Sequence, residues 1–186
     1  MATGELWDAA RAVARLRARP WTGRAWRFHR GVYGATDAGG SLLVSGRYHR
    51  ATDQFPRFEV WAALYLALAP EVSLGEVLRH FSPRLLPRLN AYRLSEIEVE
   101  LRATLDCRDA AVLGVAPDKL TKDYDFTMTQ SLAGAAIARG AEAILVPSAT
   151  GLGDNLVVFP TALDASSRLT VLGSRDPRLY VQRAEG

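Results

Sequence analysis

The chain has 186 residues, of which 48% are hydrophobic and 23% charged, a composition that predicts one globular domain with a packed core and excludes a disordered chain. No apolar run approaches the roughly 20 residues of a membrane-spanning helix, so no membrane partner is expected. The net charge of +3 is small and scattered along the chain, which argues against direct binding of nucleic acid.

Cysteine and histidine usage excludes further classes of protein. Cys107 is the single cysteine, so no internal disulfide or cysteine-based zinc site can form, and a reducing cytoplasm is the expected compartment. His29, His49 and His80 lack the spacing of metal ligands, so no metal is expected. Arginine supplies nearly all the positive charge. Its planar fork suits phosphate oxygens, although codon bias would give the same enrichment.

The N-terminal segment is predicted to be helical over residues 5–18, where apolar side chains recur at helical spacing and arginines form a basic face. That face could contact a partner or a phosphate, or it could simply be solvated. Pro20 and Gly23 are expected to end the helix. Alternating side chains then predict a strand over residues 24–30.

The middle of the chain alternates between loops and regular elements. Residues 31–41 and 50–57 are rich in glycine or polar side chains and are predicted as loops. Residues 61–68 are continuously apolar, which fits a strand or a helix. A helix is predicted over residues 71–81, and partial alternation predicts a half-exposed strand over residues 92–105.

The C-terminal half adds further elements of both kinds. Residues 109–115 could form a short helix, and residues 127–139 are predicted as a longer one, with Gly140 as its C-terminal cap. Residues 169–172 and 179–181 are candidates for edge strands. The pattern as a whole predicts an α+β fold with a mostly β core.

A glycine-rich turn joins two short apolar runs near the C-terminus. Residues 144–146 and 156–159 are predicted as buried strands, and the turn between them carries Ser148 and Asn155. Polar side chains on such a turn could meet a ligand whose oxygens approach the backbone. An ordinary hairpin loop is the alternative.

Several other positions carry side chains suited to ligand chemistry, and each also has a structural explanation. Arg27 could be a strand residue with its stem packed, Tyr65 a core residue, and Glu76 an exposed helix residue. Ser148 could be a turn former. Arg47 follows a glycine and precedes Tyr48, which places a guanidinium and a ring on flexible backbone.

The order of these residues resembles the RES-domain family, which is named after its Arg, Glu and Ser positions. The resemblance covers roughly residues 24–160 and rests on the following motifs: Trp26-Arg27-Phe28, Gly46-Arg47-Tyr48-His49, Tyr65-Leu66-Ala67, Glu76, Thr129-Gln130, Pro147-Ser148-Ala149 and Asn155-Leu156-Val157. It implies a single RES-type domain over residues 1–186, with residues 1–20 as an N-terminal amphipathic helix.

The resemblance also implies a fold and an activity. The fold would have two packed β-sheets with surrounding helices, similar to mono-ADP-ribosyltransferases, and a cleft for NAD. Members are toxins that degrade NAD by phosphorolysis or hydrolysis, or transfer ADP-ribose to a protein. Their partner is an antitoxin with an Xre-like domain that blocks the cleft. Water, inorganic phosphate and a protein side chain remain open as acceptors, as does the oligomeric state.

The chemistry of the nicotinamide–ribose bond suggests a role for each residue. Glu76 would stabilise the positive charge that develops at C1′. Arg47 first and Arg27 second would bind the diphosphate. Tyr65 would lie against the nicotinamide ring, beside Tyr48. Ser148 and Asn155 would bind ribose, phosphate or an incoming phosphate nucleophile, which makes Ser148 a catalytic candidate beside Glu76 and Arg47.

Two departures from the family pattern motivate an alternative function. Tyr48 stands where the family has Trp, and His49 stands where it has Asn, so an amide near Arg47 is lost. The interval from Arg47 to Tyr65 is long, and an insertion at residues 50–58 is expected near the cleft. The alternative is a non-catalytic module that binds a nucleotide or a partner on the same fold.

Overall fold

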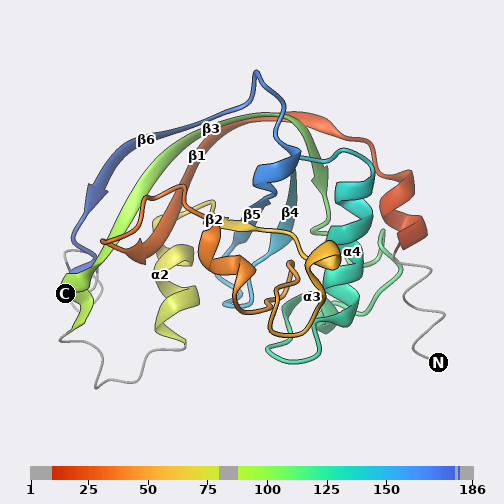
Figure 1. Ribbon diagram of the computed structural model, residues 1–186, viewed down its shortest axis with the longest axis horizontal. Coiled ribbons are helices and arrows are strands. Elements are labelled where there is room, and N and C mark those ends of the chain that lie inside the picture. The colour runs from red at the N-terminus through yellow and green to blue at the C-terminus, as the bar shows by residue number, and fades with distance from the viewer. Residues whose placement is uncertain (1–9, 80–87, 179, 181–186) are drawn as a thin grey trace.

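Six β-strands form the centre of the fold in the computed structural model, which describes residues 10–79, 88–178 and 180 (Figure 1). The strands are β1 (Arg19–Arg30), β2 (Leu64–Ala67), β3 (Tyr92–Asp106), β4 (Ala143–Pro147), β5 (Asp154–Val158) and β6 (Arg168–Arg175). The helices are α2 (Pro70–Leu78), α3 (Asp118–Thr121) and α4 (Thr127–Ala138), with 3-10 turns at Gly39–Leu42, Arg57–Glu59 and Pro160–Ala162. The predicted mixture of helices around a β core is confirmed.

The strands are hydrogen-bonded into one sheet in the order β1-β2-β5-β4-β3-β6, and β1 also pairs with β3. Because β1 contacts both β2 and β3, the pairing closes into a ring, and β6 lies outside it along β3. The expected pair of packed sheets is therefore not separate in its hydrogen bonding. The long strands β1 and β3 arch over the short strands in Figure 1. They pair with each other, and β3 also pairs with the short strand β4, so the long and the short strands are hydrogen-bonded together.

Two apolar clusters fill the spaces on either side of the short strands. One lies between the long strands and the short ones and includes Ala25, Ile97, Leu66 and Leu156, each at most 1% exposed. The burial of these side chains on facing strands is the main stabilising contribution at the centre of the sheet.

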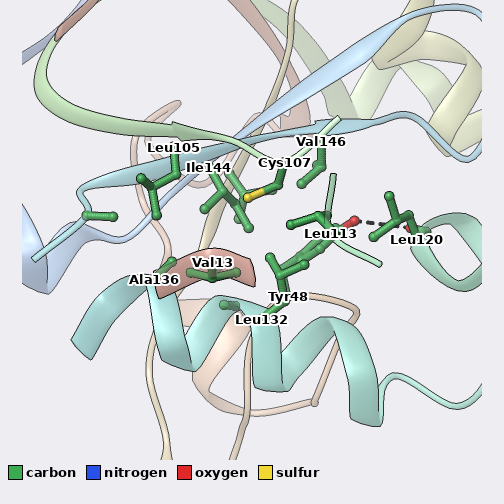
Figure 2. Packing of buried hydrophobic residues seen from close by; sticks show 14 of the residues in the cluster. Val13, Tyr48, Leu105, Cys107, Leu113, Leu120, Leu132, Ala136, Ile144 and Val146 are labelled. Carbon is green, nitrogen blue, oxygen red and sulfur yellow. Dashed lines mark hydrogen bonds between the residues drawn. The ribbon is translucent and has the colours of Figure 1, made fainter. Parts of the chain in front are cut away.

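The second cluster packs α4 against the outer face of β4 and β5 (Figure 2). Leu132 of α4, Ile144 of β4 and Val157 of β5 are fully buried there, together with Val13 from the N-terminal helix. Since β4 and β5 are covered on both faces, both of their faces must be apolar. This explains the continuous apolar runs that predicted them.

The N-terminal elements differ in length from the prediction. Residues 10–15 are helical, and the first part of the predicted helix lies outside the described residues. β1 begins at Arg19 and passes through Pro20 and Gly23, which were expected only to end the helix. The register with β3 shifts between Arg19 and Trp21, because Pro20 has no N–H to give to the ladder.

The middle and later predictions have mixed outcomes. The ambiguous segment at residues 61–68 contains the strand β2, and α2 ends at Leu78, while residues 80 and 81 lie outside the described range. α4 agrees with its predicted range, and Gly140 after it has a left-handed φ of 74°.

The predicted helix at residues 109–115 is wrong. Asp109 instead accepts hydrogen bonds from the backbone N–H groups of Ala111 and Val112, which favours turns over a helix. The edge strand expected at residues 169–172 lies within β6. Of the second one, expected at residues 179–181, only Tyr180 lies within the described residues, and it is helical rather than extended. No helix in the described ranges is long and apolar enough to cross a lipid bilayer.

Candidate active site

A pocket of about 340 Å³ opens between β1, β2, α2 and the turn at residues 46–49. Its volume lies within the range of small-molecule sites. It is lined by Phe28, Arg47, Tyr48, Tyr65, Leu66, Ala67, Ser73, Glu76, Val77 and Asn155. The structure thus brings residues from distant parts of the sequence to one cavity.

Glu76 reaches the pocket because α2 packs closely on two neighbours. The backbone N–H of Phe28 in β1 donates to Ser73 Oγ at 3.0 Å, which ties one face of the helix to the sheet. On another face Gly75 allows the turn after β4 to approach. A Cβ at Gly75 would lie 3.1 Å from Leu152 Cδ1 and 3.2 Å from Thr150 Cγ2.

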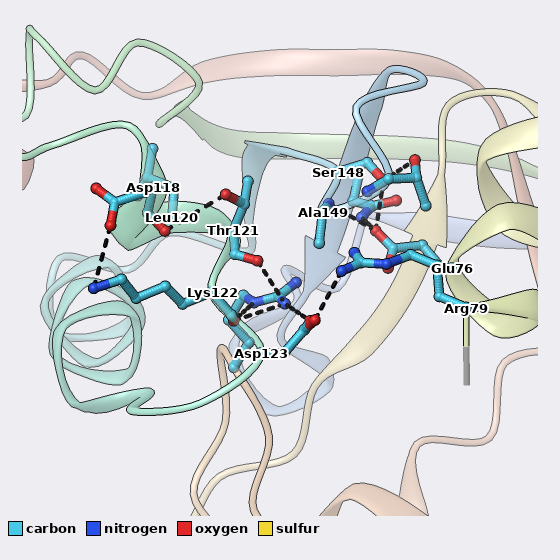
Figure 3. Close-up of polar contacts among 12 residues, drawn as sticks. Glu76, Arg79, Asp118, Leu120, Thr121, Lys122, Asp123, Ser148 and Ala149 are labelled. Atoms are coloured by element: carbon cyan, nitrogen blue, oxygen red, sulfur yellow. Dashed lines mark hydrogen bonds and ion pairs between the residues drawn. The ribbon is translucent and has the colours of Figure 1, made fainter.

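The carboxylate of Glu76 is held by the turn that the sequence singled out (Figure 3). Its Oε1 accepts hydrogen bonds from Ser148 Oγ at 2.5 Å, Ala149 N at 3.1 Å and Asn155 Nδ2 at 2.9 Å. Its Oε2 accepts no hydrogen bond from the described part of the chain, and it is therefore the oxygen left for a ligand. Three donors on one oxygen fix the orientation of the carboxylate.

The turn that carries Arg47 is clamped from α4. Gln130 Nε2 donates to the carbonyl oxygens of Gly46 at 3.0 Å and His49 at 3.2 Å, and Gly46 N donates to His49 O at 3.2 Å. The His49 ring packs against Gly46 so closely that a Cβ there would lie 2.4 Å from His49 Cε1. Only glycine fits at this position without displacing the ring.

The guanidinium of Arg47 is oriented by the loop after α3. It donates to Lys122 O from Nε at 3.0 Å and from Nη2 at 2.8 Å, and Nη2 also donates to Thr121 O. Asp123 Oδ1 lies 3.1 Å from the same Nη2, and Asp123 Oδ2 lies 2.8 Å from Nη2 of Arg79. One aspartate therefore bridges two arginines, one of which lines the pocket.

Two tyrosines, the buried Tyr48 and the partly buried Tyr65, line the pocket together with Glu76. The hydroxyl of Tyr65 accepts a hydrogen bond from Tyr48 N at 2.9 Å and contacts His49 Nδ1 at 2.9 Å. His49 Nε2 lies 2.8 Å from Val44 O, a pure acceptor, so Nε2 carries the proton and Nδ1 accepts from Tyr65. Burial raises the pKa of Tyr48 and of Tyr65, which keeps both hydroxyls neutral.

Arg27 is one predicted site residue that does not line this pocket. It lies on the same face of β1 as the buried Ala25, and its Nη1 donates to Ala35 O at 2.8 Å. Burial lowers the pKa of its guanidinium. Phe28, on the opposite face of the strand, lines the pocket instead.

The other predicted residues fall into two groups. Arg47, Tyr48, Tyr65, Glu76 and Asn155 line the pocket. Ser148, which is 2% exposed, stands behind Glu76 and reaches the pocket only through it.

Sequence reasoning missed Arg79 and Asp123. Arg79 follows Glu76 by three residues, so the helical spacing could have placed both on one face of α2, but nothing local marks Asp123 as their neighbour. None of residues 50–58, the expected insertion near the cleft, lines the pocket. Among the described residues, no group of three His, Cys, Asp or Glu side chains is placed to hold a metal ion.

Comparison with known proteins adds a family and a fold. The sequence model of the RES domain matches residues 24–181. One solved structure that matches is the M. tuberculosis MbcT-MbcA toxin-antitoxin complex, with a TM-score of 0.78 and 22% identity over 96% of this chain and 98% of that chain. At this identity the likeness establishes the fold. No curated protein matches the chain significantly.

Proposed function

Because the chain belongs to the RES-domain family, we propose that it is an NAD-consuming toxin of a toxin–antitoxin pair. The observation that carries the proposal is the meeting of Glu76 and Arg47, an oriented carboxylate and an oriented guanidinium, at one pocket. The proposal includes an ADP-ribosyltransferase-like arrangement of the strands and cleavage of the bond between nicotinamide and ribose.

The reaction needs a carboxylate close to the ribose. When the bond at C1′ breaks, nicotinamide leaves with the electron pair and positive charge develops on the ribose, as in glycoside cleavage. Oε2 of Glu76 can accept a hydrogen bond from a ribose hydroxyl and stabilise that charge. The acceptor, which is water, phosphate or a protein group, then bonds to C1′ and loses its proton to solvent.

Other lining residues supply binding rather than bond cleavage. Arg47 has a guanidinium nitrogen, Nη1, that donates to no acceptor within the described residues and is available to a phosphate oxygen. Tyr65 and Tyr48 offer aromatic surface for the nicotinamide ring. Asn155 lines the pocket beside Glu76 and can bind a ribose hydroxyl.

An antitoxin is the proposed protein partner. The similar solved structure is a complex of a toxin with its antitoxin, MbcA. We extend that kind of partner to this chain, with an Xre-like antitoxin that covers the pocket and stops the reaction. NAD is the proposed substrate, and inorganic phosphate is the proposed second substrate if the reaction is phosphorolysis.

Release of nicotinamide from NAD tests the proposal directly. We expect the purified protein to release nicotinamide, with inorganic phosphate present or absent, and Glu76→Gln to lower the rate by about 10²–10³-fold, because the amide cannot stabilise developing positive charge. Glu71→Gln is the matched control, since Glu71 lies exposed in the first turn of the same helix. That variant should retain full activity.

Two results would contradict the proposal in different ways. Absence of nicotinamide release and of ADP-ribose transfer to any protein would remove the enzyme. Calorimetric binding of NAD without turnover, unchanged in Glu76→Gln, would favour the non-catalytic module.

A further inference from the structure

Asp123 lies beside Arg79 (Figure 3) and also pairs with Arg47, which lines the pocket. Its Oδ1 pairs with Arg47 at 3.1 Å and its Oδ2 with Arg79 at 2.8 Å, so each carboxylate oxygen serves a different guanidinium. The side chain of Arg47 is 15% exposed, that of Arg79 33% and that of Asp123 48%. The aspartate is thus the most exposed member of the three.

The two arginines are placed by separate parts of the fold. Arg47 is fixed by carbonyl oxygens of the loop after α3. Arg79 caps the C-terminal end of α2, one turn after Glu76, and its backbone N–H donates to Gly75 O. The guanidinium of Arg47 therefore does not depend on Asp123 for its position, whereas Arg79 is anchored through its backbone and contacts Asp123 through its guanidinium. An anion that took over both contacts of Asp123 would meet the same two guanidinium groups.

An anion with two oxygens bridging two guanidiniums is the arrangement in which arginines bind a phosphate group. We propose that Arg47 and Arg79 form a phosphate-binding site that Asp123 occupies in the free protein and that a phosphate group of the substrate takes over. The identity of that substrate rests on the proposed function. The phosphate group belongs either to the diphosphate of a dinucleotide or to inorganic phosphate.

Charge and exposure make the exchange feasible. Arg47 and Arg79 carry two positive charges against the single negative charge of Asp123, whereas a phosphate group brings up to two negative charges. Because the side chain of Asp123 is about half exposed, it can move into water with little change in its solvation. An exposed ion pair of this kind is also weak. Asp123 therefore acts as an internal competitor that lowers the apparent affinity for phosphate.

Anion binding to variants of these residues, measured by calorimetry in phosphate-free buffer at fixed ionic strength, tests the proposal. ADP-ribose and inorganic phosphate are titrated separately, which distinguishes a diphosphate site from a phosphate site. Asp123→Asn should bind at least one of the two about fivefold more tightly than the unaltered protein, because the competitor is gone. Arg79→Gln should bind the same anion about fivefold more weakly.

Asp118→Asn is the matched control. Asp118 is also exposed, pairs with Lys122 and lies on the same segment, so its substitution removes one negative charge without freeing an arginine of the pair. Its anion affinity should stay within about twofold of the unaltered protein, because an exposed pair contributes little. Asp123→Ser provides a second variant if Asp123→Asn folds poorly by circular dichroism.

The outcomes separate this proposal from the proposed function. Equal affinities in the Asp123 and Asp118 variants would overturn it, as would no effect of Arg79→Gln or no anion binding to any of the proteins. Tighter binding in the Asp123 variant without nicotinamide release would support the phosphate site while removing the NAD-consuming activity.

Discussion

Ser148 holds Glu76 in place and does not itself line the pocket. Its hydroxyl donates to Glu76 Oε1 and accepts from Thr150 N at 3.1 Å, and it is 2% exposed. A hydroxyl that donates its single proton to a carboxylate has no proton left to donate to a substrate. This geometry predicts that Ser148 positions Glu76, whereas the sequence predicted a catalytic role for it.

Removal of the Ser148 hydroxyl should show whether Ser148 positions Glu76 or binds the substrate. In Ser148→Ala, Glu76 loses one of three donors and shifts relative to the ribose, so kcat for nicotinamide release should fall about tenfold while KM changes little. Steady-state kinetics with NAD measure both. Ser166→Ala, on a turn with Asp164, is the control and should leave kcat unchanged. A rise in KM with unchanged kcat would instead show that Ser148 binds substrate.

The sequence predicted some residues of the site and not others, for physical reasons. Glu76 and Arg47 stand in motifs whose order could be recognised. Arg27 was predicted from the resemblance, through the motif Trp26-Arg27-Phe28, but arginine and aromatic side chains occur on both faces of β1, so the motif alone could not tell which face meets the pocket. The pairing of Arg79 with Asp123 depends on how α2 meets a distant loop, which no local spacing encodes.

One glutamine and one glycine hold the turn at residues 46–49 in place. Gln130 binds two of its carbonyl oxygens, and Gly46 leaves room for the His49 ring. This arrangement gives the Thr129-Gln130 motif a structural explanation, because the glutamine at the start of α4 fixes the turn that presents Arg47. The turn and α4 therefore form one positioning unit.

Addition of a methyl group at Gly46 should disturb that unit. A Cβ 2.4 Å from His49 Cε1 must push the ring away, and overpacking of this kind costs about 1–3 kcal/mol in the free energy of unfolding. Urea denaturation of Gly46→Ala measures this loss. Gly40→Ala is the matched control, since a Cβ at Gly40 would meet no atom within 4 Å, and it should change stability by less than about 0.5 kcal/mol. Equal effects of the two substitutions would contradict the prediction.

Elements were predictable where burial alone determined their pattern. β4 and β5 lie between two apolar clusters, so their short apolar runs could be recognised without the rest of the fold. β1 was predicted too short because Pro20 and Gly23 favour turns locally. Its pairing with β3 tolerates Pro20 through a register shift between Arg19 and Trp21 and includes Gly23 in regular register opposite Val99. This is a tertiary effect that overrides local preference.

The arrangement of the whole molecule could not be derived from the sequence. The strand order β1-β2-β5-β4-β3-β6 places β2, from the first half of the chain, beside β5, from the second half, and β1 joins β2 through the single pair Trp26 and Ala67. Such pairings depend on register between distant segments. The resemblance predicted two packed sheets, whereas the described strands are hydrogen-bonded into one sheet in which β1 pairs with both β2 and β3.

Two buried histidines couple the stability of the whole molecule to pH. His29 Nε2 lies 2.8 Å from Ser95 Oγ, and Nδ1 contacts Arg30 O. Because a carbonyl oxygen can only accept, Nδ1 carries the proton, and Nε2 of the neutral ring accepts from Ser95. Burial is the main cause that lowers the pKa of both rings below 6.5. Nearby Arg27 and Arg93 lower the pKa of His29 further, while Asp53 opposes the shift at His49.

The direction of the pH effect follows from these shifts. Below pH 6.5 the unfolded chain binds protons at His29 and His49 more readily than the folded chain, so the free energy of unfolding should fall as the pH is lowered from 7 towards 5. Carboxylates whose pKa is lowered in the fold, such as that of Asp106 below its ordinary 3.8, lose their contribution only at still lower pH. Urea denaturation at several pH values measures the slope. His49→Asn should make it shallower between pH 5 and 7, because one of the two shifted groups is removed. An unchanged or steeper slope would show that His49 is not neutral in the folded protein.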